Sequence, residues 1–234
     1  MQLSIASLTG DFPDFRVAAV VASGLDIAAA RPKDLAAMIA QAEEQCRARW
    51  AGQELSAIPG IAAWRKAYRA FGIKRTSYRS SVERLVKNVL AGRALPAINA
   101  FVDAYNAISL SHVMPLGADD LDRITGNVAF RLSRPGDSFV DMAAEEGEDP
   151  NDPPKPGEVV YADDDHVLCR RWNWRQDARS LVTTATRRAI VTVQSNGVGD
   201  VDKAAAELGE LIGRFCGGAV RIAIADRETP VVTL

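Results

Sequence analysis

The stretch CRRWNWRQ, residues 169 to 176, sets three arginines, an asparagine and a glutamine around two tryptophans. Alternate residues of a strand share a face, so an extended chain would present Arg171, Asn173 and Arg175 together, with both tryptophans opposite. Guanidinium groups bind phosphate or carboxylate, and asparagine both donates and accepts hydrogen bonds. The stretch therefore predicts a strand with one face in the core and one toward a polar ligand. The alternative is that the arginines pair with acidic residues or face solvent.

A second polar pattern lies in a helix predicted to start at Pro96. Asn99, Asp103 and Asn106 fall at i, i+4 and i+7, which places them on one helical face. Short polar side chains are poor helix formers, so a stripe of them needs a physical reason. One interpretation is the hydrogen-bonding wall of a pocket, and the other is a solvated or capping role.

Familiar catalytic motifs are absent from the sequence. There is no G-x-S-x-G, no P-loop and no G-x-G-x-x-G ahead of a helix. The two histidines, His112 and His166, have neither a metal-ligand spacing nor a nucleophile placed by a known motif. We therefore expect no metal and no cofactor. Any hydrolysis would depend on an oriented water and the substrate's own groups, and whether the protein is an enzyme stays open.

Charged residues are segregated along the chain, although the net charge is only −2. Residues 61–100 hold nine lysines and arginines against one acid, and residues 170–188 hold six arginines against one acid. Residues 137–165 hold eleven acids against one lysine. The basic segments could bind an anionic partner together, or all three segments could be solvated faces that balance one another. The candidate residues for binding an anion such as an RNA backbone are Arg65, Arg69, Lys74, Arg75, Arg79 and Lys87.

The elements that must position these side chains are both helical and extended. Apolar periodicity and capping signals predict helices at 32–50, 61–71, 81–91, 96–110 and 201–216. Runs rich in β-forming residues, alternation and turn residues predict strands at 15–25, 127–133, 158–162, 167–175, 189–195 and 219–225. Residues 143–157 are acidic and rich in proline and glycine, which predicts an exposed loop. The fold class is therefore α+β, with mixed strands packed against several helices.

The composition is that of an ordinary globular protein of 234 residues, with 47% hydrophobic and 25% charged residues. No apolar run is long enough to span a membrane, and the N-terminus lacks a secretory signal pattern. The three cysteines are odd in number and far apart, which argues against a disulfide scaffold. We expect a cytoplasmic protein with no membrane partner.

Three segments together resemble a known family. These are the run from YRSSVERL through PLGADD to NVAFRLS, the stretch GEVVYADDDHVLCRRWNWRQ, and the T-x-x-T-x-x-A-I-V strand. They resemble the B3/B4 domain, the tRNA-binding and editing domain of the phenylalanyl-tRNA synthetase beta subunit, and most closely its free-standing bacterial forms. The resemblance implies one B3/B4-like domain over residues 1–234, with a recognisable core at about 60–225. It also implies two interleaved subdomains with a pocket between them.

The resemblance also suggests pocket residues. In the synthetase, the pocket hydrolyses tyrosine mischarged onto the phenylalanine tRNA. Asn106 of VDAYN matches an asparagine of that pocket. Three positions differ from the synthetase pattern: Tyr105 replaces threonine, Gly117 replaces histidine in P-L-H-x-F-D, and Gln194 falls where a glutamate reads the tyrosine hydroxyl. Because of these differences, the substrate amino acid and catalysis itself stay open.

The expected function combines the residue patterns with the resemblance. It is binding of tRNA or aminoacyl-tRNA in translation quality control, with trans-editing hydrolysis of a mischarged aminoacyl ester as the open catalytic step and no DNA partner. The alternatives are a non-catalytic module for an amino acid or other small molecule, and a protein-interaction module using residues 143–157. The pocket candidates are Asn99, Asp103, Asn106, Asp119, Arg171, Asn173, Arg175 and Gln194.

Overall fold

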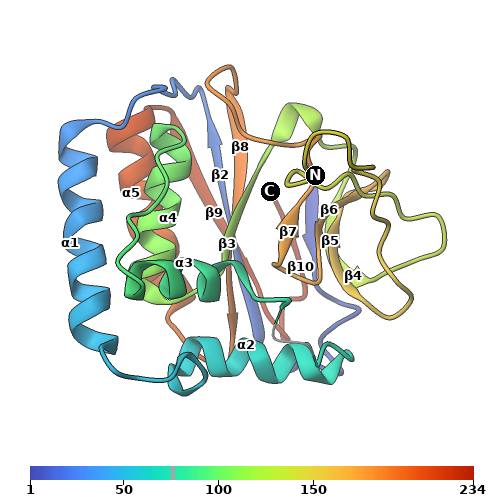
Figure 1. Cartoon of the computed structure of the whole chain (residues 1–234). Coiled ribbons are helices and arrows are strands. Elements are labelled where there is room, and N and C mark those ends of the chain that lie inside the picture. Colours follow the sequence, from blue (N-terminus) through green and yellow to red (C-terminus); the bar gives the residue numbers. More distant parts are fainter. Residues whose placement is uncertain (75–76) are drawn as a thin grey trace.

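A computed structural model describes residues 1–74 and 77–234 and contains five α-helices and two β-sheets within that part of the chain (Figure 1). The helices are α1 (Lys33–Trp50), α2 (Pro59–Ala70), α3 (Ser81–Leu90), α4 (Ala100–His112) and α5 (Val201–Cys216). The 3-10 turns are η1 (Leu55–Ala57) and η2 (Leu121–Arg123). The predicted α+β class is confirmed.

One sheet has four antiparallel strands in the order β3-β8-β2-β9. The strands are β2 (Phe15–Ser23), β3 (Leu116–Asp120), β8 (Arg188–Asn196) and β9 (Ala219–Ala225). Residues Ala18, Val20 and Ala22 of β2 pack toward α1, α4 and α5, which Figure 1 shows stacked on one side of this sheet. Because side chains alternate along a strand, Phe15, Val17 and Ala19 face a second core.

The second sheet has the order β10-β1-β4-β5-β6-β7. Its strands are β1 (Gln2–Ser4), β4 (Val128–Leu132), β5 (Val159–Ala162), β6 (Val167–Arg170), β7 (Arg175–Gln176) and β10 (Val231–Thr233). Leu3, Phe130 and Leu168 of this sheet share the second core with Phe15 of β2 and Trp64 of α2. The chain begins in the second sheet with β1, enters the first sheet for β2 and β3, and returns to the second sheet for β4 to β7. It then adds β8 and β9 to the first sheet and β10 to the second, so the implied interleaving of two subdomains is confirmed.

Two predicted boundaries are wrong for physical reasons. The helix predicted from Pro96 begins instead at Ala100, because Asn99 has extended backbone angles and its Oδ1 accepts the N–H of Val102 at 2.9 Å. The strand predicted at 167–175 ends at Arg170, because Arg171 and Trp172 have positive φ angles of 45° and 67°. Acidic residues 143–157 form an irregular, largely exposed segment, as predicted.

In the part of the chain that the structure describes, no helix is both long enough and apolar enough to cross a membrane.

Candidate functional site

A cavity of about 310 Å³ lies where both sheets meet helices α3 and α4. Its walls come from β3 and β8 of one sheet, from β5, β6 and β7 of the other, and from the segment that joins β6 to β7. The polar and aromatic residues that line it are Ser81, Arg84, Tyr105, Asn106, Asp119, Tyr161, Cys169, Asn173, Trp174, Arg175, Gln176, Thr192 and Gln194. A cavity with this mixture of apolar walls and convergent polar groups is typical of a small-ligand site.

The stretch CRRWNWRQ reaches the cavity through a turn, and the alternation predicted for it is wrong. Trp172 is fully buried in the second core, whereas Trp174 lines the cavity, so the two tryptophans do not share a face. The turn carries Asn173, Trp174 and Arg175 into the wall one after another. An extended strand would have sent alternate members of this set to the opposite side.

Arg171 does not line the cavity. Its guanidinium carbon lies 3.9 Å from the ring centroid of Tyr78 and 4.3 Å from that of Trp174, which are cation–π distances. Its Nη2 lies 3.3 Å from Oε1 of Glu158, and the residue is 4% exposed. Arg171 therefore packs against the ring of Trp174. It was expected to contact a ligand, and in the structure it makes these packing contacts instead. Arg175 lines the cavity and pairs with Asp141.

A chain of hydrogen bonds fixes the two amides in the wall. Tyr68 Oη donates to Asn173 Oδ1 at 2.9 Å, and Asn173 Nδ2 donates to Gln194 Oε1 at 3.1 Å. Gln194 Nε2 then donates to Thr192 Oγ1 at 3.0 Å. Each amide nitrogen carries two N–H groups and donates one of them to the next side chain of this series, which leaves a second N–H of each without a hydrogen bond among the described residues.

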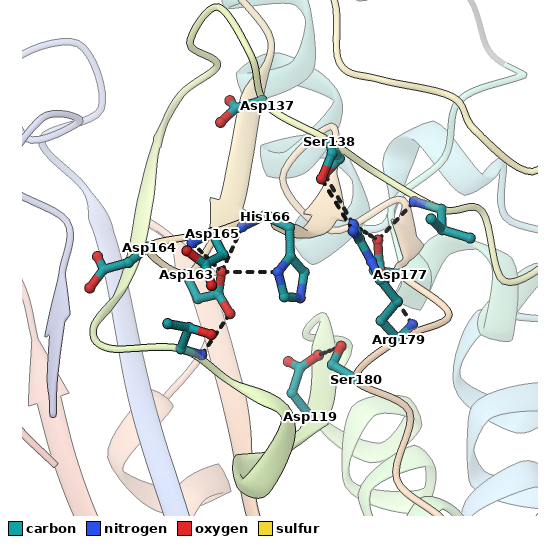
Figure 2. Close-up of polar contacts among 12 residues, drawn as sticks. Asp119, Asp137, Ser138, Asp163, Asp164, Asp165, His166, Asp177, Arg179 and Ser180 are labelled. Atoms are coloured by element: carbon teal, nitrogen blue, oxygen red, sulfur yellow. Dashed lines mark hydrogen bonds and ion pairs between the residues drawn. The ribbon is translucent and has the colours of Figure 1, made fainter.

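Asp119 is the acidic group of the cavity wall. It is 3% exposed, and its Oδ1 accepts hydrogen bonds from Ser180 Oγ at 2.6 Å and from Gln176 Nε2 at 3.0 Å (Figure 2 shows the Ser180 contact). Burial raises the pKa of Asp119 to about 7, although the hydrogen bonds from Ser180 and Gln176 act in the opposite direction. The carboxyl group therefore changes its protonation state close to neutral pH.

Of the three residues in the predicted polar stripe of α4, two form structural hydrogen bonds and one lines the cavity. Asn99 caps the helix, and Asp103 is buried, where it binds Arg31 Nε at 2.8 Å and the N–H of Ile98 at 3.0 Å. Neither side chain lines the cavity, so the expectation of one continuous wall is not met for these two residues. Asn106 does line it, beside Tyr105. The capping role that the sequence left open accounts for Asn99.

The basic candidates on α2 and α3 are partly neutralised. Arg65 binds Glu83 through Nε at 3.1 Å and Nη2 at 2.7 Å, and Arg79 Nε lies 3.1 Å from the same carboxylate. Ser80 caps α3 by accepting the N–H of Glu83 at 3.4 Å, as its spacing predicted. Arg69, Lys74 and Lys87 are exposed. Arg75 lies outside the described residues.

The sequence analysis missed several lining residues, including Arg84, Tyr161 and Gln176. Arg84 falls on the polar side of an amphipathic helix, where a lining residue has the same pattern as a solvated one. Tyr161 was assigned to a strand, and only the pairing of β5 with β6 brings it to the cavity. Gln176 was within reach of sequence reasoning, since it ends the stretch that supplies Asn173 and Arg175.

These features define an α+β protein built from two interleaved sheets, with a polar cavity at their junction. A family model described as the B3/4 domain matches residues 63–213. The chain therefore belongs to the B3/4 domain family, and the resemblance seen in the sequence is confirmed.

Two similar proteins have longer chains than this one. A stretch of 83 residues is 25% identical to the phenylalanine–tRNA ligase beta subunit of Mycoplasma genitalium, covering 36% of this chain and 10% of that protein. A crystal structure of an N-terminal fragment of the phenylalanyl-tRNA synthetase beta subunit from Pyrococcus horikoshii matches with a TM-score of 0.46 and 12% identity. That match covers 94% of this chain and 49% of the fragment. The chain thus spans a small part of the curated relative's length and about half of the solved fragment.

Proposed function

We propose that this protein binds the aminoacylated end of a tRNA, with the aminoacyl group in the cavity. The observation that carries the proposal is the composition of the cavity wall. Asn173 and Gln194 offer fixed amide donors for an ester or carboxylate, and Arg84 and Arg175 line the same cavity while keeping solvent exposure. Membership of the B3/4 domain family supports the same ligand, since a similar protein is the phenylalanine–tRNA ligase beta subunit.

Electrostatics at Arg84 favours an anion beside the aminoacyl group. Although Arg84 keeps solvent exposure, partial desolvation by the cavity wall and the neighbouring charge of Arg175 lower the pKa of its guanidinium. Among residues 1–74 and 77–234, Arg84 forms no ion pair. A phosphate near the ester end of an RNA would relieve the repulsion between the two guanidinium groups.

The proposal extends to hydrolysis of the bound ester by water. Water adds to the ester carbonyl carbon, the bond from that carbon to the ribose oxygen breaks, and the ribose hydroxyl leaves with a proton from the water. The products are a free amino acid and an uncharged tRNA. Cys169 lines the cavity, but burial and the nearby Asp119 raise the pKa of its thiol well above the usual range. The thiol therefore stays protonated near pH 7 and is a poor nucleophile, which supports water as the attacking group.

A binding and deacylation assay across a panel of correctly charged and mischarged tRNAs tests the proposal. We expect binding that weakens as salt rises, release of the amino acid from at least one aminoacyl-tRNA, and at least tenfold weaker binding in Arg84→Gln. The matched control is Arg227→Gln, which removes an exposed positive charge outside the cavity and should leave binding unchanged. The proposal is overturned if the protein shows no turnover of any aminoacyl-tRNA and no salt-sensitive binding to any tRNA.

A second candidate is a non-catalytic module that binds a free amino acid. The pairing of Arg65 and Arg79 with Glu83 favours it, because it leaves less free positive charge on α2 and α3 for an RNA backbone. In that case free amino acids raise the melting temperature, the increase is lost in Asn106→Ala, and tRNA has no effect. The same panel therefore separates the two functions.

A further inference from the structure

The cavity contains a buried acid that has no cation of its own. Asp119 makes both of its hydrogen bonds through Oδ1, and within the described residues its carboxyl group forms no ion pair. The neighbouring arginines have other partners, since Arg175 pairs with Asp141 and Arg179 with Asp177. Buried carboxylates are normally compensated by a cation or by several hydrogen bonds. The described residues provide no cation for the charged form of Asp119.

Two further buried carboxylates make the surroundings of Asp119 more negative, and both are already compensated. Asp163 accepts the N–H groups of Thr125 at 2.9 Å, Asp165 at 2.9 Å and His166 at 2.7 Å, and His166 Nδ1 lies 3.4 Å from it (Figure 2). Asp177 binds Arg179 through Nε at 2.9 Å and Nη2 at 2.7 Å. Both carboxylates raise the pKa of Asp119, so both contribute negative potential at the cavity wall.

The wall around Asp119 also contains an unsatisfied hydroxyl and two aromatic rings. Tyr161 lines the cavity, is 2% exposed, and has no hydrogen-bond partner for its hydroxyl among the described residues. Tyr105 lines the cavity as well. All three residues line the same cavity, where burial and, to a smaller extent, the charge of Asp119 raise the pKa of both tyrosines. A carboxylate flanked by aromatic rings and a free hydroxyl is suited to an organic cation that also donates hydrogen bonds.

We propose that Asp119 receives a primary ammonium group of the ligand, and that the cavity therefore selects ligands with a free amine over N-acylated ones. This inference rests on the proposed function, for which it names the substrate class as aminoacyl groups with an unblocked amine. The ammonium supplies the missing cation, and Tyr161 Oη is positioned in the same wall as an acceptor.

Ligand affinity should then depend on pH in a definite direction. The ammonium binds the charged form of Asp119, so affinity rises as pH increases through the pKa of about 7. The ionisable groups around Asp119 are the carboxylates of Asp163 and Asp177, each with a basic partner (His166 and Arg179), and the side chains of Tyr105, Tyr161 and Cys169. Because an unfavourable protonation state reduces apparent affinity by the fraction that is competent, binding should be about tenfold tighter at pH 8 than at pH 6.

Calorimetry with free amino acids and their N-acetyl derivatives tests this directly. L-amino acids keep their ammonium group charged across pH 6 to 8, so the pH change acts on the protein alone. We expect the unaltered protein to bind the N-acetyl derivatives at least tenfold more weakly than the free amino acids. We also expect Asp119→Asn, which keeps the size of the side chain, to bind all free amines at least tenfold more weakly than the unaltered protein does. Asp122→Asn is the control, because Asp122 is exposed and pairs with Arg188. Nα-acetyl-L-lysine, which keeps only a side-chain ammonium, distinguishes an α-amino ligand from a side-chain one.

A second arm compares aminoacyl-tRNA with N-acetyl-aminoacyl-tRNA on the unaltered protein, so that it does not depend on any variant folding. Equal binding of the two tRNAs overturns the ammonium inference while the proposed function stands. Discrimination between free and acetylated amino acids without any tRNA binding overturns the proposed function while the inference stands. Unchanged amine affinity in Asp119→Asn also overturns the inference, whatever the tRNA result.

Discussion

At the scale of single residues, the cavity wall combines amide groups that stay neutral with one carboxyl group whose charge changes with pH. Asn173 and Gln194 are neutral amides whose orientation is set by Tyr68 and Thr192. Asp119 is different, because burial brings its pKa to about 7, although the hydrogen bonds that it accepts from Ser180 and Gln176 act in the opposite direction. Its titration therefore affects stability as well as binding.

Asp119→Asn should reduce the dependence of stability on pH. An aspartate in the unfolded chain has a pKa of about 3.9, and in the folded protein Asp119 has one of about 7. Between these values the folded state holds a proton that the unfolded state has lost, so the free energy of unfolding falls as pH rises, by about 1.4 kcal/mol per unit. Above pH 7 this decline stops. Asparagine does not titrate, so the variant lacks this decline.

Urea unfolding at pH 5 and pH 8 measures the effect. The loss of stability between these conditions should be smaller in Asp119→Asn than in the unaltered protein by about 2 to 3 kcal/mol. Asp122→Asn, with its exposed carboxylate, should behave like the unaltered protein. Identical pH dependence in all three proteins would contradict the assignment of Asp119 as a group with a raised pKa.

At the scale of elements, the turn between β6 and β7 decides what the cavity contains. Arg171 and Trp172 both have left-handed backbone angles, a conformation that costs about 1 to 2 kcal/mol for each non-glycine residue. The cost is offset by the burial of Trp172 and by the stacking of Arg171 between Tyr78 and Trp174. The turn lets three successive residues, 173 to 175, contribute to one wall.

An ion pair between Arg65 of α2 and Glu83 of α3 links these two helices. Removing the charge of Glu83 should strengthen RNA binding if the RNA lies on these helices. Glu83→Gln releases Arg65 and Arg79 from a carboxylate that is 2% exposed. The logarithm of tRNA affinity should then fall more steeply with the logarithm of salt concentration, by a slope of about one to two. The free energy of unfolding should drop by about 1 to 3 kcal/mol, because a charged hydrogen bond is lost.

Salt titrations of tRNA binding, together with urea unfolding, check this expectation. Glu210→Gln on the exposed side of α5 removes the same charge elsewhere and is the control for net charge. An unchanged salt slope in Glu83→Gln, with reduced stability, would exclude the face of α2 and α3 as the RNA-binding surface.

At the scale of the whole molecule, one aromatic cluster joins the two sheets. The ring of Trp172 makes edge-on contacts with Phe12, Phe15 and Trp64, at centroid distances of 4.7, 4.9 and 5.2 Å. Phe15 belongs to β2 and Trp64 to α2, whereas Trp172 follows β6 of the other sheet. The two interleaved subdomains therefore share a core and should unfold together.

Trp172→Ala should lower the free energy of unfolding by about 3 to 5 kcal/mol, since it empties the centre of this shared core. Trp174→Ala is the matched control, because Trp174 lines the cavity and is only partly buried, so its loss should cost less stability. Urea unfolding followed by fluorescence and by circular dichroism should give one coincident transition in each variant. A smaller effect for Trp172 than for Trp174, or two separate transitions, would contradict a shared core.

Local patterns in the sequence were sufficient for most elements and for part of the site. The run of valines and alanines in β2 and the apolar stripe of α1 are local signals, and both elements form where the sequence predicts them. Among the pocket candidates, the structure places in the wall Asn106, Asp119, Asn173, Arg175 and Gln194. Arg171 is displaced because a favourable tertiary environment stabilises backbone angles that no local rule favours. Asp103 is buried by Arg31, whose position depends on contacts far along the chain.

The pairing of β1 with β10 also has a consequence for biosynthesis. Gln2 lies opposite Thr233, so β1 leaves the ribosome long before its antiparallel neighbour β10 is made. At the usual rates of translation, these partners are synthesised roughly 10 to 45 s apart. β1 must therefore be kept from other pairings during that interval, and the sheet can be completed only after β10 has left the ribosome.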